Sequence, residues 1–168
     1  CESLTELARD LKLWGLRIDY GFGAAQIGEM ATQMPIVLNA STTSVADARR
    51  IAAKGREVFA LHNFYPRPET GLDEEYLMQT SARLREAGLS VQAFIPGDTL
   101  LRGPLHEGLP TLEAHRHVLP SAACVDMALK LGMPEARIPL GDAAVLMATS
   151  PKSNSGHVAL DAALADVR

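Results

Sequence analysis

Short apolar runs alternate with amphipathic segments along this chain, and this alternation limits its fold more than any other feature. Five runs of strand length recur, over residues 14–18, 35–38, 57–61, 89–95 and 136–140. Between them apolar residues return every three or four positions, as in helices that pack along one side. Near-continuous apolar strands separated by helices predict a parallel sheet buried on both faces. The fold class is therefore α/β.

Capping residues mark the ends of the predicted helices. Ser44 and Asp73 each precede a helical pattern, and Gly55 and Gly88 follow the two patterns. Pro120 interrupts a later stretch that is helical by composition, which predicts two helices or a sharp kink there. The helical patterns outside these two lie over residues 4–14, 24–30 and 111–131.

Each predicted strand ends in a polar side chain: Asp19, Asn39, His62 with Asn63, Asp98 and Asp142. A doubly wound sheet gathers its ligand groups at one switch point, whereas a (β/α)8 (TIM) barrel gathers them from the C-terminal ends of many strands. This distribution favours a barrel. Five strands do not close a barrel of eight, and about 250 residues are typical of that fold, so we expect about 80 residues to be missing.

Composition narrows the class of protein. The chain has 168 residues, of which 47% are hydrophobic and 21% charged, as in a soluble protein with one core. It contains no apolar run of membrane-spanning length and no secretory leader, so we expect a cytoplasmic protein without a membrane partner. The formal net charge is -4 with scattered basic residues, which argues against a nucleic-acid partner. The chain begins with Cys1, which suggests that its start is missing.

Residues 62–71 form the densest polar segment, directly after an apolar run. His62, Asn63, Tyr65 and Arg67 offer hydrogen-bonding groups on a backbone that two prolines restrict. The segment predicts a binding site, and the alternative is an ordinary turn.

A second dense segment covers residues 102–116. Arg102 beside Gly103 is a candidate anion site, because a guanidinium offers a planar fork and glycine lets an anion approach the backbone. Glu107 is a candidate general acid or base. Solvated surface side chains are the alternative for Arg102 and for Glu107.

Two further carboxylates, Asp19 and Asp142, follow apolar strands where barrel active sites form. A carboxylate pair supplies an acid and a nucleophile or base for glycoside hydrolysis. The competing hypothesis is a metal site of Asp19, His62, His115 and Asp142 for Zn, Mn or Fe, although no metal-ligand spacing motif is present. Residues 21–23 lack the rest of a nucleotide-binding fingerprint, and we expect no cofactor.

Several motifs together resemble those of the MupG-like 6-phospho-N-acetylmuramidase family. They occur in the family's order between residues 1 and 142, over residues 16–22, 38–42, 62–72, 93–97, 102–116 and 141–142. The resemblance implies a TIM barrel of which this chain supplies roughly strands four to eight, over residues 1–149. Residues 150–168 are linker-like, and the family's second, small β-rich domain is not in the sequence.

The resemblance also implies a function. Such enzymes hydrolyse glycosides of N-acetylmuramic acid 6-phosphate in cell-wall recycling. For this chain we expect no metal and no cofactor. We assign the acid/base role to Asp19 and Glu107, with Asp142 as the alternative; the resemblance supports the site rather than this division of roles. The implied substrate contacts are Asn39, His62, Asn63, Tyr65, Arg67, Arg102, Gly103, His115 and Arg116. The alternatives are a non-catalytic phosphosugar-binding remnant and a metal-dependent hydrolase. The oligomeric state stays open. We expect the chain alone to be inactive and unstable.

Overall fold

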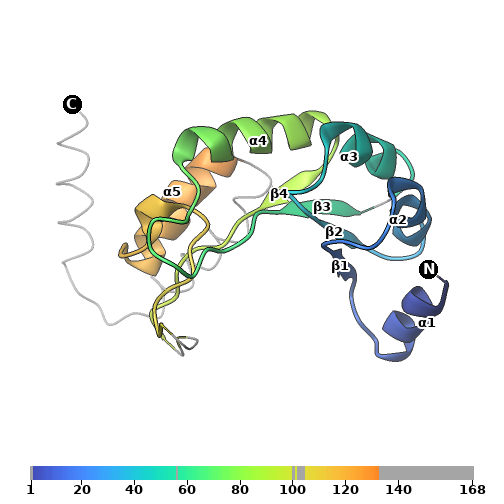
Figure 1. Ribbon diagram of the computed structural model, residues 1–168, viewed down its shortest axis with the longest axis horizontal. Coiled ribbons are helices and arrows are strands. Elements are labelled where there is room, and N and C mark those ends of the chain that lie inside the picture. Colours follow the sequence, from blue (N-terminus) through green and yellow to red (C-terminus); the bar gives the residue numbers. More distant parts are fainter. Residues whose placement is uncertain (1, 56, 100, 102–104, 133–168) are drawn as a thin grey trace, which may run out of the picture.

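The computed structural model describes residues 2–55, 57–99, 101 and 105–132. Helices and strands alternate through most of this part of the chain, as Figure 1 shows. The elements in order are α1 (Glu2–Asp10), β1 (Leu16–Ile18), α2 (Ala24–Ala31), β2 (Ile36–Asn39), α3 (Val45–Ala52), β3 (Val58–Leu61), α4 (Glu74–Glu86), β4 (Ser90–Gln92), the 3₁₀ helix η1 (Glu113–His115) and α5 (Pro120–Leu131). The predicted α/β class is confirmed. The fifth predicted strand, over residues 136–140, lies outside the described residues.

The four strands form one parallel sheet in the order β1-β2-β3-β4. In this register Ile36 lies between Leu16 and Val58. Figure 1 shows α2, α3 and α4 along one face of the sheet. A doubly wound sheet carries helices on both faces and reverses its strand order at the switch point. Consecutive strands with helices on one side are instead the arrangement of part of a (β/α)8 barrel. The assignment to strands four to eight stays a prediction.

The core lies between the sheet and these helices. Alternate strand residues point toward the helices and are fully buried, including Ile36, Leu38, Ala60 and Val91. On the other face the strand residues are half-buried or exposed, except Asn39 at the end of β2, which is buried. Among the described residues the sheet is therefore fully buried on its helix-covered face only, in contrast to the burial on both faces predicted from the apolar runs. We call the other face the open face.

The predicted caps form as expected. Ser44 accepts a hydrogen bond from the Asp47 amide at 3.1 Å, and Asp73 accepts one from the Tyr76 amide at 2.7 Å. Pro120 occupies the first turn of α5, where its missing N–H has no helical partner to lose. The alternative of two helices is therefore confirmed, with η1 as the first.

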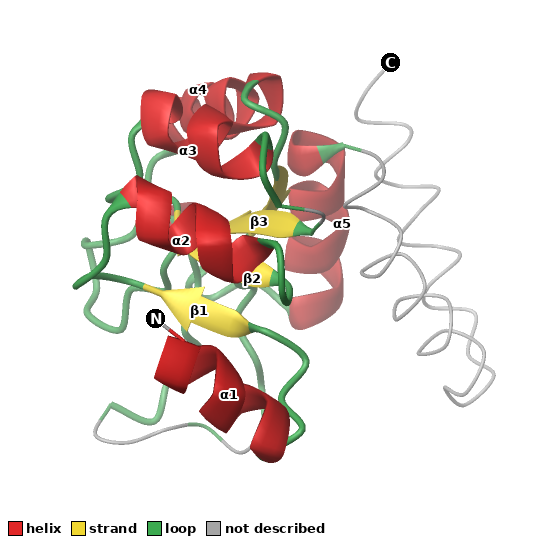
Figure 2. Ribbon diagram, turned by 90° about the vertical axis from the view of Figure 1, so that its right-hand side faces the viewer, coloured by secondary structure: helices red, strands yellow, loops and turns green. Residues whose placement is uncertain are grey.

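The ends of the sheet differ in their neighbours. Figure 2 shows α1 beside β1, and α5 packs against α4 near the opposite end. Within the described part of the chain, every helix is too short or too polar to cross a bilayer.

Candidate functional site

A polar cluster lies on the open face where β1, β2 and β3 end. It consists of Arg17, Asp19, Asn39 and Asn63, and we call it the strand-end cluster. Residues two positions apart in a strand share a face, which puts Arg17 and Asp19 together, and the parallel register brings Asn39 beside Asp19. The sequence therefore sets this convergence through strand alternation and register.

Hydrogen bonds join all members of the strand-end cluster. Asp19 Oδ1 accepts from Arg17 Nη2 and from Asn39 Nδ2, each at 3.0 Å. Arg17 Nη2 also donates to Asn63 Oδ1, and Asn63 Nδ2 donates to Asn39 Oδ1 at 3.3 Å. The side chain of Arg17 is 31% exposed and that of Asp19 is 42% exposed. The cluster thus holds an oriented carboxylate that a ligand on the open face can reach.

A cavity of about 160 Å³ adjoins Asp19. Apolar side chains from the strands and from α2 and α3 form part of its lining, including Ile18, Ile27, Leu38 and Ile51. The polar part of the lining comes from Asp19, Tyr20, Thr42, Thr43 and Asp47. Because Ile18 and Leu38 face the helices, this space lies on the helix side of the strand ends and is separate from the open face.

The neighbours His62 and Asn63 face opposite sides of the sheet. Asn63 joins the strand-end cluster, whereas His62 is fully buried, with Nε2 3.0 Å from Ser81 Oγ on α4. Burial lowers the pKa of His62 to about 4, so its ring is neutral at pH 7. His62 lies on the helix side of the strand end, away from the position of a substrate contact on the open face.

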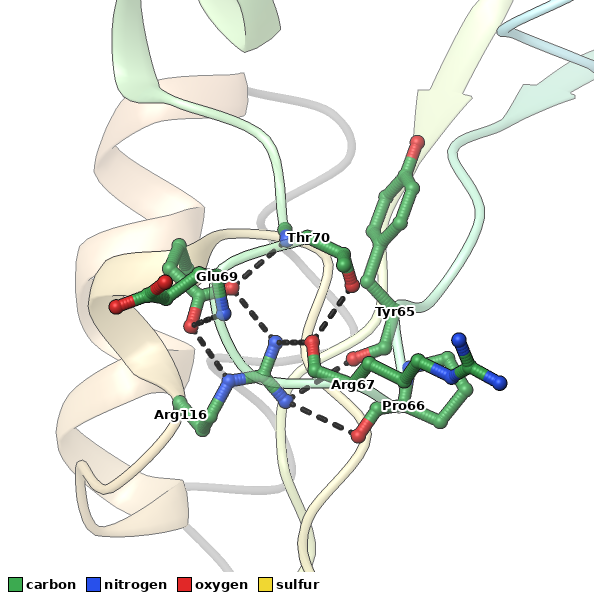
Figure 3. A network of polar contacts seen from close by, with 8 residues as sticks. Tyr65, Pro66, Arg67, Glu69, Thr70 and Arg116 are labelled. Atoms are coloured by element: carbon green, nitrogen blue, oxygen red, sulfur yellow. Dashed lines mark hydrogen bonds and ion pairs between the residues drawn. The ribbon is translucent and has the colours of Figure 1, made fainter.

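The segment after Asn63 is fixed by a second polar network, which we call the loop clamp. It consists of Glu113, Arg116 and the backbone of residues 65–71 (Figure 3). Glu113 and Arg116 form a two-point ion pair, in which Arg116 Nε and Nη2 each lie 2.6 Å from a carboxylate oxygen. Hydrogen bonding to Arg116 lowers the pKa of Glu113 to about 2. The hydrogen bond to Glu113 in turn raises the pKa of Arg116.

Both partners of the ion pair also bind the loop backbone. Arg116 donates to the carbonyl oxygens of Tyr65 at 3.0 Å and Arg67 at 2.9 Å. The Glu113 carboxylate accepts from the amides of Glu69 at 2.9 Å and Gly71 at 2.7 Å. The side chain of Arg116 is only 2% exposed, so Arg116, predicted as a substrate contact, instead holds the loop.

His115, also predicted as a substrate contact, links η1 to helices α5 and α4. Its Nε2 lies 2.7 Å from Asp126, which also binds Lys130 at 2.7 Å, and Lys130 reaches Glu74 at 3.2 Å. Burial alone would raise the pKa of Asp126, but hydrogen bonds from Lys130 and His115 outweigh it and hold that pKa below its ordinary value. The His115 side chain is buried, its Nε2 is bonded to Asp126, and its Nδ1 has no hydrogen-bond partner among the described residues, so this network chiefly packs helices together.

Three of the predicted site residues lie on the loops. Tyr65 is half-buried and Arg67 is exposed. Glu107 is half-buried, and its Oε2 is buried without a hydrogen-bond partner among the described residues. The predicted residues Arg102, Gly103 and Asp142 lie outside the described part of the chain.

The metal hypothesis finds no cluster to support it in the described ranges. No group of three or more His, Cys, Asp and Glu side chains there is placed to hold a metal ion. His62 binds Ser81 and His115 binds Asp126, at different places in the fold. Asp142, the fourth predicted ligand, is outside these ranges.

Two functional residues were missed by the sequence reasoning. Arg17 was counted within an apolar run, although a cation two positions before Asp19 on a strand is a signal that both share a face. Glu113 was overlooked because its partners are backbone amides of a loop more than forty residues away. Its spacing of three from Arg116 was the available signal.

Comparison with known proteins places the chain in a family. Residues 1–144 match the family model described as 6-phospho-N-acetylmuramidase, N-terminal. The chain belongs to this 6-phospho-N-acetylmuramidase family. The resemblance seen in the motifs is thereby confirmed, and the strand-end cluster and the loop clamp both lie inside the matched residues.

Two solved structures are similar to this member of the family. A conserved Enterococcus faecalis protein of unknown function shares 38% identity at a TM-score of 0.68, over 77% of this chain and 37% of that one. An uncharacterized B. cereus protein shares 29% identity at a TM-score of 0.61, over 71% of this chain and 36% of that one. This chain therefore spans little more than a third of either protein.

A curated protein also matches a short part of the chain. Replication-associated recombination protein A of Bacillus subtilis (strain 168) is 46% identical over 61 residues, which are 36% of this chain and 14% of that protein. So small a share of that protein carries no argument about what this chain does.

Proposed function

We propose that the protein containing this chain is a glycosidase that hydrolyses glycosides of N-acetylmuramic acid 6-phosphate. One observation carries the proposal. In a chain of the 6-phospho-N-acetylmuramidase family, Asp19 presents a carboxylate on the open face and is oriented there by Arg17 and Asn39. Barrel enzymes collect their catalytic groups at this end of the strands.

The proposed chemistry uses two carboxylates. Glycoside hydrolysis needs one carboxyl group to protonate the leaving oxygen and another to act as nucleophile or to activate water. Asp19, fixed by two side-chain donors to one of its oxygens, is our candidate for the second role. Glu107, whose Oε2 has no partner among the described residues, is our candidate for the acid. Asp142 is the alternative for either role.

The anionic groups of the substrate need cationic and polar partners. A muramic acid 6-phosphate carries a phosphate and a lactyl carboxylate, and guanidinium groups bind both in a two-point manner. Arg67 and Arg102 are our candidates for these anions. Asn39, Asn63 and Tyr65 would orient the hydroxyl and acetamido groups.

The test is the release of free sugar from a glycoside of N-acetylmuramic acid 6-phosphate by the complete protein. We expect Asp19→Asn and Glu107→Gln each to lower kcat by about 10²-fold or more, the usual contribution of a positioned acid or base. Full activity in both variants would refute this assignment of roles. Substrate binding without turnover in the unaltered protein would favour the phosphosugar-binding alternative.

The metal-dependent alternative is tested with the same assay. Turnover that survives exhaustive chelation eliminates it. Turnover that is lost on chelation and returns when Zn²⁺ or Mn²⁺ is added would replace our proposal with that one.

A further inference from the structure

Two arginines at the loop clamp, Arg116 and Arg67, lie next to each other in space but differ in what their guanidinium groups bind. Arg116 directs its guanidinium at Glu113 and at carbonyl oxygens of the loop. Figure 3 shows that the Arg67 side chain extends away from this network, although its own carbonyl oxygen is part of it. Arg67 is exposed, and its guanidinium makes no ion pair within the described residues. One arginine is therefore committed to the protein, and the other is available to a ligand.

The clamp holds the loop by its backbone alone. Arg116 donates hydrogen bonds to carbonyl oxygens on the N-terminal side of the loop, and Glu113 accepts hydrogen bonds from amides on its C-terminal side. Thr70 Oγ1 adds a bond to the Arg67 carbonyl at 2.6 Å. None of these bonds uses the side chain of Arg67. The loop can therefore be fixed before a ligand arrives, and its cationic side chain stays free.

The loop adopts a conformation that needs such support. Glu69 has a φ of 61°, in the left-handed region that residues with a Cβ seldom adopt. Its amide is one of the two that Glu113 accepts. An unfavourable backbone conformation persists where surrounding contacts hold it, and such residues gather at ligand-binding sites.

We propose that Glu113 and Arg116 are positioning residues that preset this loop, so that Arg67 selects substrates carrying a phosphomonoester. The identity of the ligand rests on the proposed function. A loop that is already fixed loses little conformational entropy when the ligand binds. More of the favourable interaction between guanidinium and phosphate therefore appears as affinity. The Glu113–Arg116 pair neutralises itself, so the ligand meets the charge of Arg67 rather than that of Arg116.

The experiment measures binding of N-acetylmuramic acid 6-phosphate and of N-acetylmuramic acid to the complete protein by calorimetry. We expect Arg67→Gln to weaken binding of the phosphorylated ligand by about 10- to 100-fold, as loss of a charged hydrogen bond does, and to leave the other ligand nearly unchanged. Glu113→Gln keeps the shape of the side chain but loses the charge and one acceptor, and we expect it to lower the preference for phosphate by about fivefold or more.

The double variant decides whether the two residues act together. If Glu113 works through Arg67, the phosphate preference of the double variant equals that of Arg67→Gln alone. Glu86→Gln is the matched control, because it makes the same change at an exposed carboxylate of α4 outside the clamp, so the preference should stay at the unaltered value. An equal loss for both ligands in Glu113→Gln, or losses that multiply in the double variant, would overturn the proposal.

A measurement on the unaltered protein covers the case in which Glu113→Gln does not fold. Hydrogen exchange at the amides of Glu69 and Gly71 should be slow without ligand and unchanged with it. Protection that appears only with ligand would contradict a preset loop. The sugar-release assay separates the two proposals. If Arg67 gives a preference for phosphate but the protein hydrolyses no glycoside, the proposed function fails and this inference stands. If the protein hydrolyses the glycoside but Glu113→Gln does not change the phosphate preference, this inference alone fails.

Discussion

The strand-end cluster and the loop clamp adjoin along the chain, yet they use charged side chains in opposite ways. In the cluster, Arg17 and Asp19 bond to other side chains and remain 31% and 42% exposed. In the clamp, Arg116 is 2% exposed and bonds to backbone groups and to Glu113. The carboxylate of the cluster stays partly exposed to solvent, whereas the charged groups of the clamp hold the loop backbone in place. The same residue types therefore present a partly exposed carboxylate in one region and hold the loop backbone in the other.

The difference has a consequence for stability. Exposed ion pairs contribute about 0–1 kcal/mol, because water and salt weaken them. Removing one partner of a buried pair costs about 3–5 kcal/mol, because the other charge is left buried without compensation. Substitutions in the clamp should therefore change folding first, and substitutions in the cluster should change function first.

The largest effect is expected from a matched pair of variants. Arg116→Met should lower the free energy of unfolding by about 2–3 kcal/mol, since two loop carbonyl oxygens lose their donor and Glu113, which is 32% exposed, loses its cation. Arg17→Met, the same change in the cluster, should lower it by less than about 1 kcal/mol. Urea unfolding of the complete protein measures both. Equal losses would remove the distinction between the two regions.

His62 gives the next largest effect, through pH. Its folded pKa of about 4 lies below the ordinary value of 6.5, so between these values the unfolded chain binds a proton that the folded chain does not. Stability therefore falls as pH decreases through this window, by about 2 kcal/mol between pH 7 and pH 5. His62→Gln should reduce that slope in unfolding measurements at the two pH values. An unchanged slope would mean that folding does not lower the pKa of His62.

A smaller effect should come from the contact between the loop and η1. A Cβ at Gly71 would lie 2.6 Å from Oε2 of Glu113 and 2.7 Å from its amide nitrogen, so Gly71→Ala must displace the clamp. We expect a loss of about 1–2 kcal/mol in the free energy of unfolding. Gly97→Ala is the control, because its Cβ would meet nothing nearer than 3.9 Å, and it should change stability by less than about 0.5 kcal/mol. A Gly71→Ala variant as stable as the control would contradict the clamp geometry.

Much of the fold follows from the sequence because local patterns determine it. Four of the five predicted strands and the caps at Ser44 and Asp73 appear in the structure, since apolar spacing and capping act over a few residues. Strands β1, β3 and β4 are shorter than predicted. Asp19, Asn39 and Asn63 could be predicted to converge, because each ends or follows a parallel strand.

The remaining features depend on orientation and on distant backbone. His62 and Asn63 are neighbours in the sequence, and only the phase of the strand decides which of them faces the open side. Arg116 was predicted to contact the substrate only through the family resemblance. Besides Glu113, its partners are carbonyl groups about fifty residues away. A backbone carbonyl is present at every residue, so the sequence does not show which ones a side chain binds.

The most direct test of this account is to measure turnover and stability together for Asp19→Asn in the complete protein. The account predicts that kcat for a glycoside of N-acetylmuramic acid 6-phosphate falls by about 10²-fold or more. It also predicts that the free energy of unfolding changes by less than about 1 kcal/mol, because Asp19 is half exposed. Full turnover in this variant, or a loss of turnover that only follows a loss of folding, would contradict the catalytic role of the strand-end cluster.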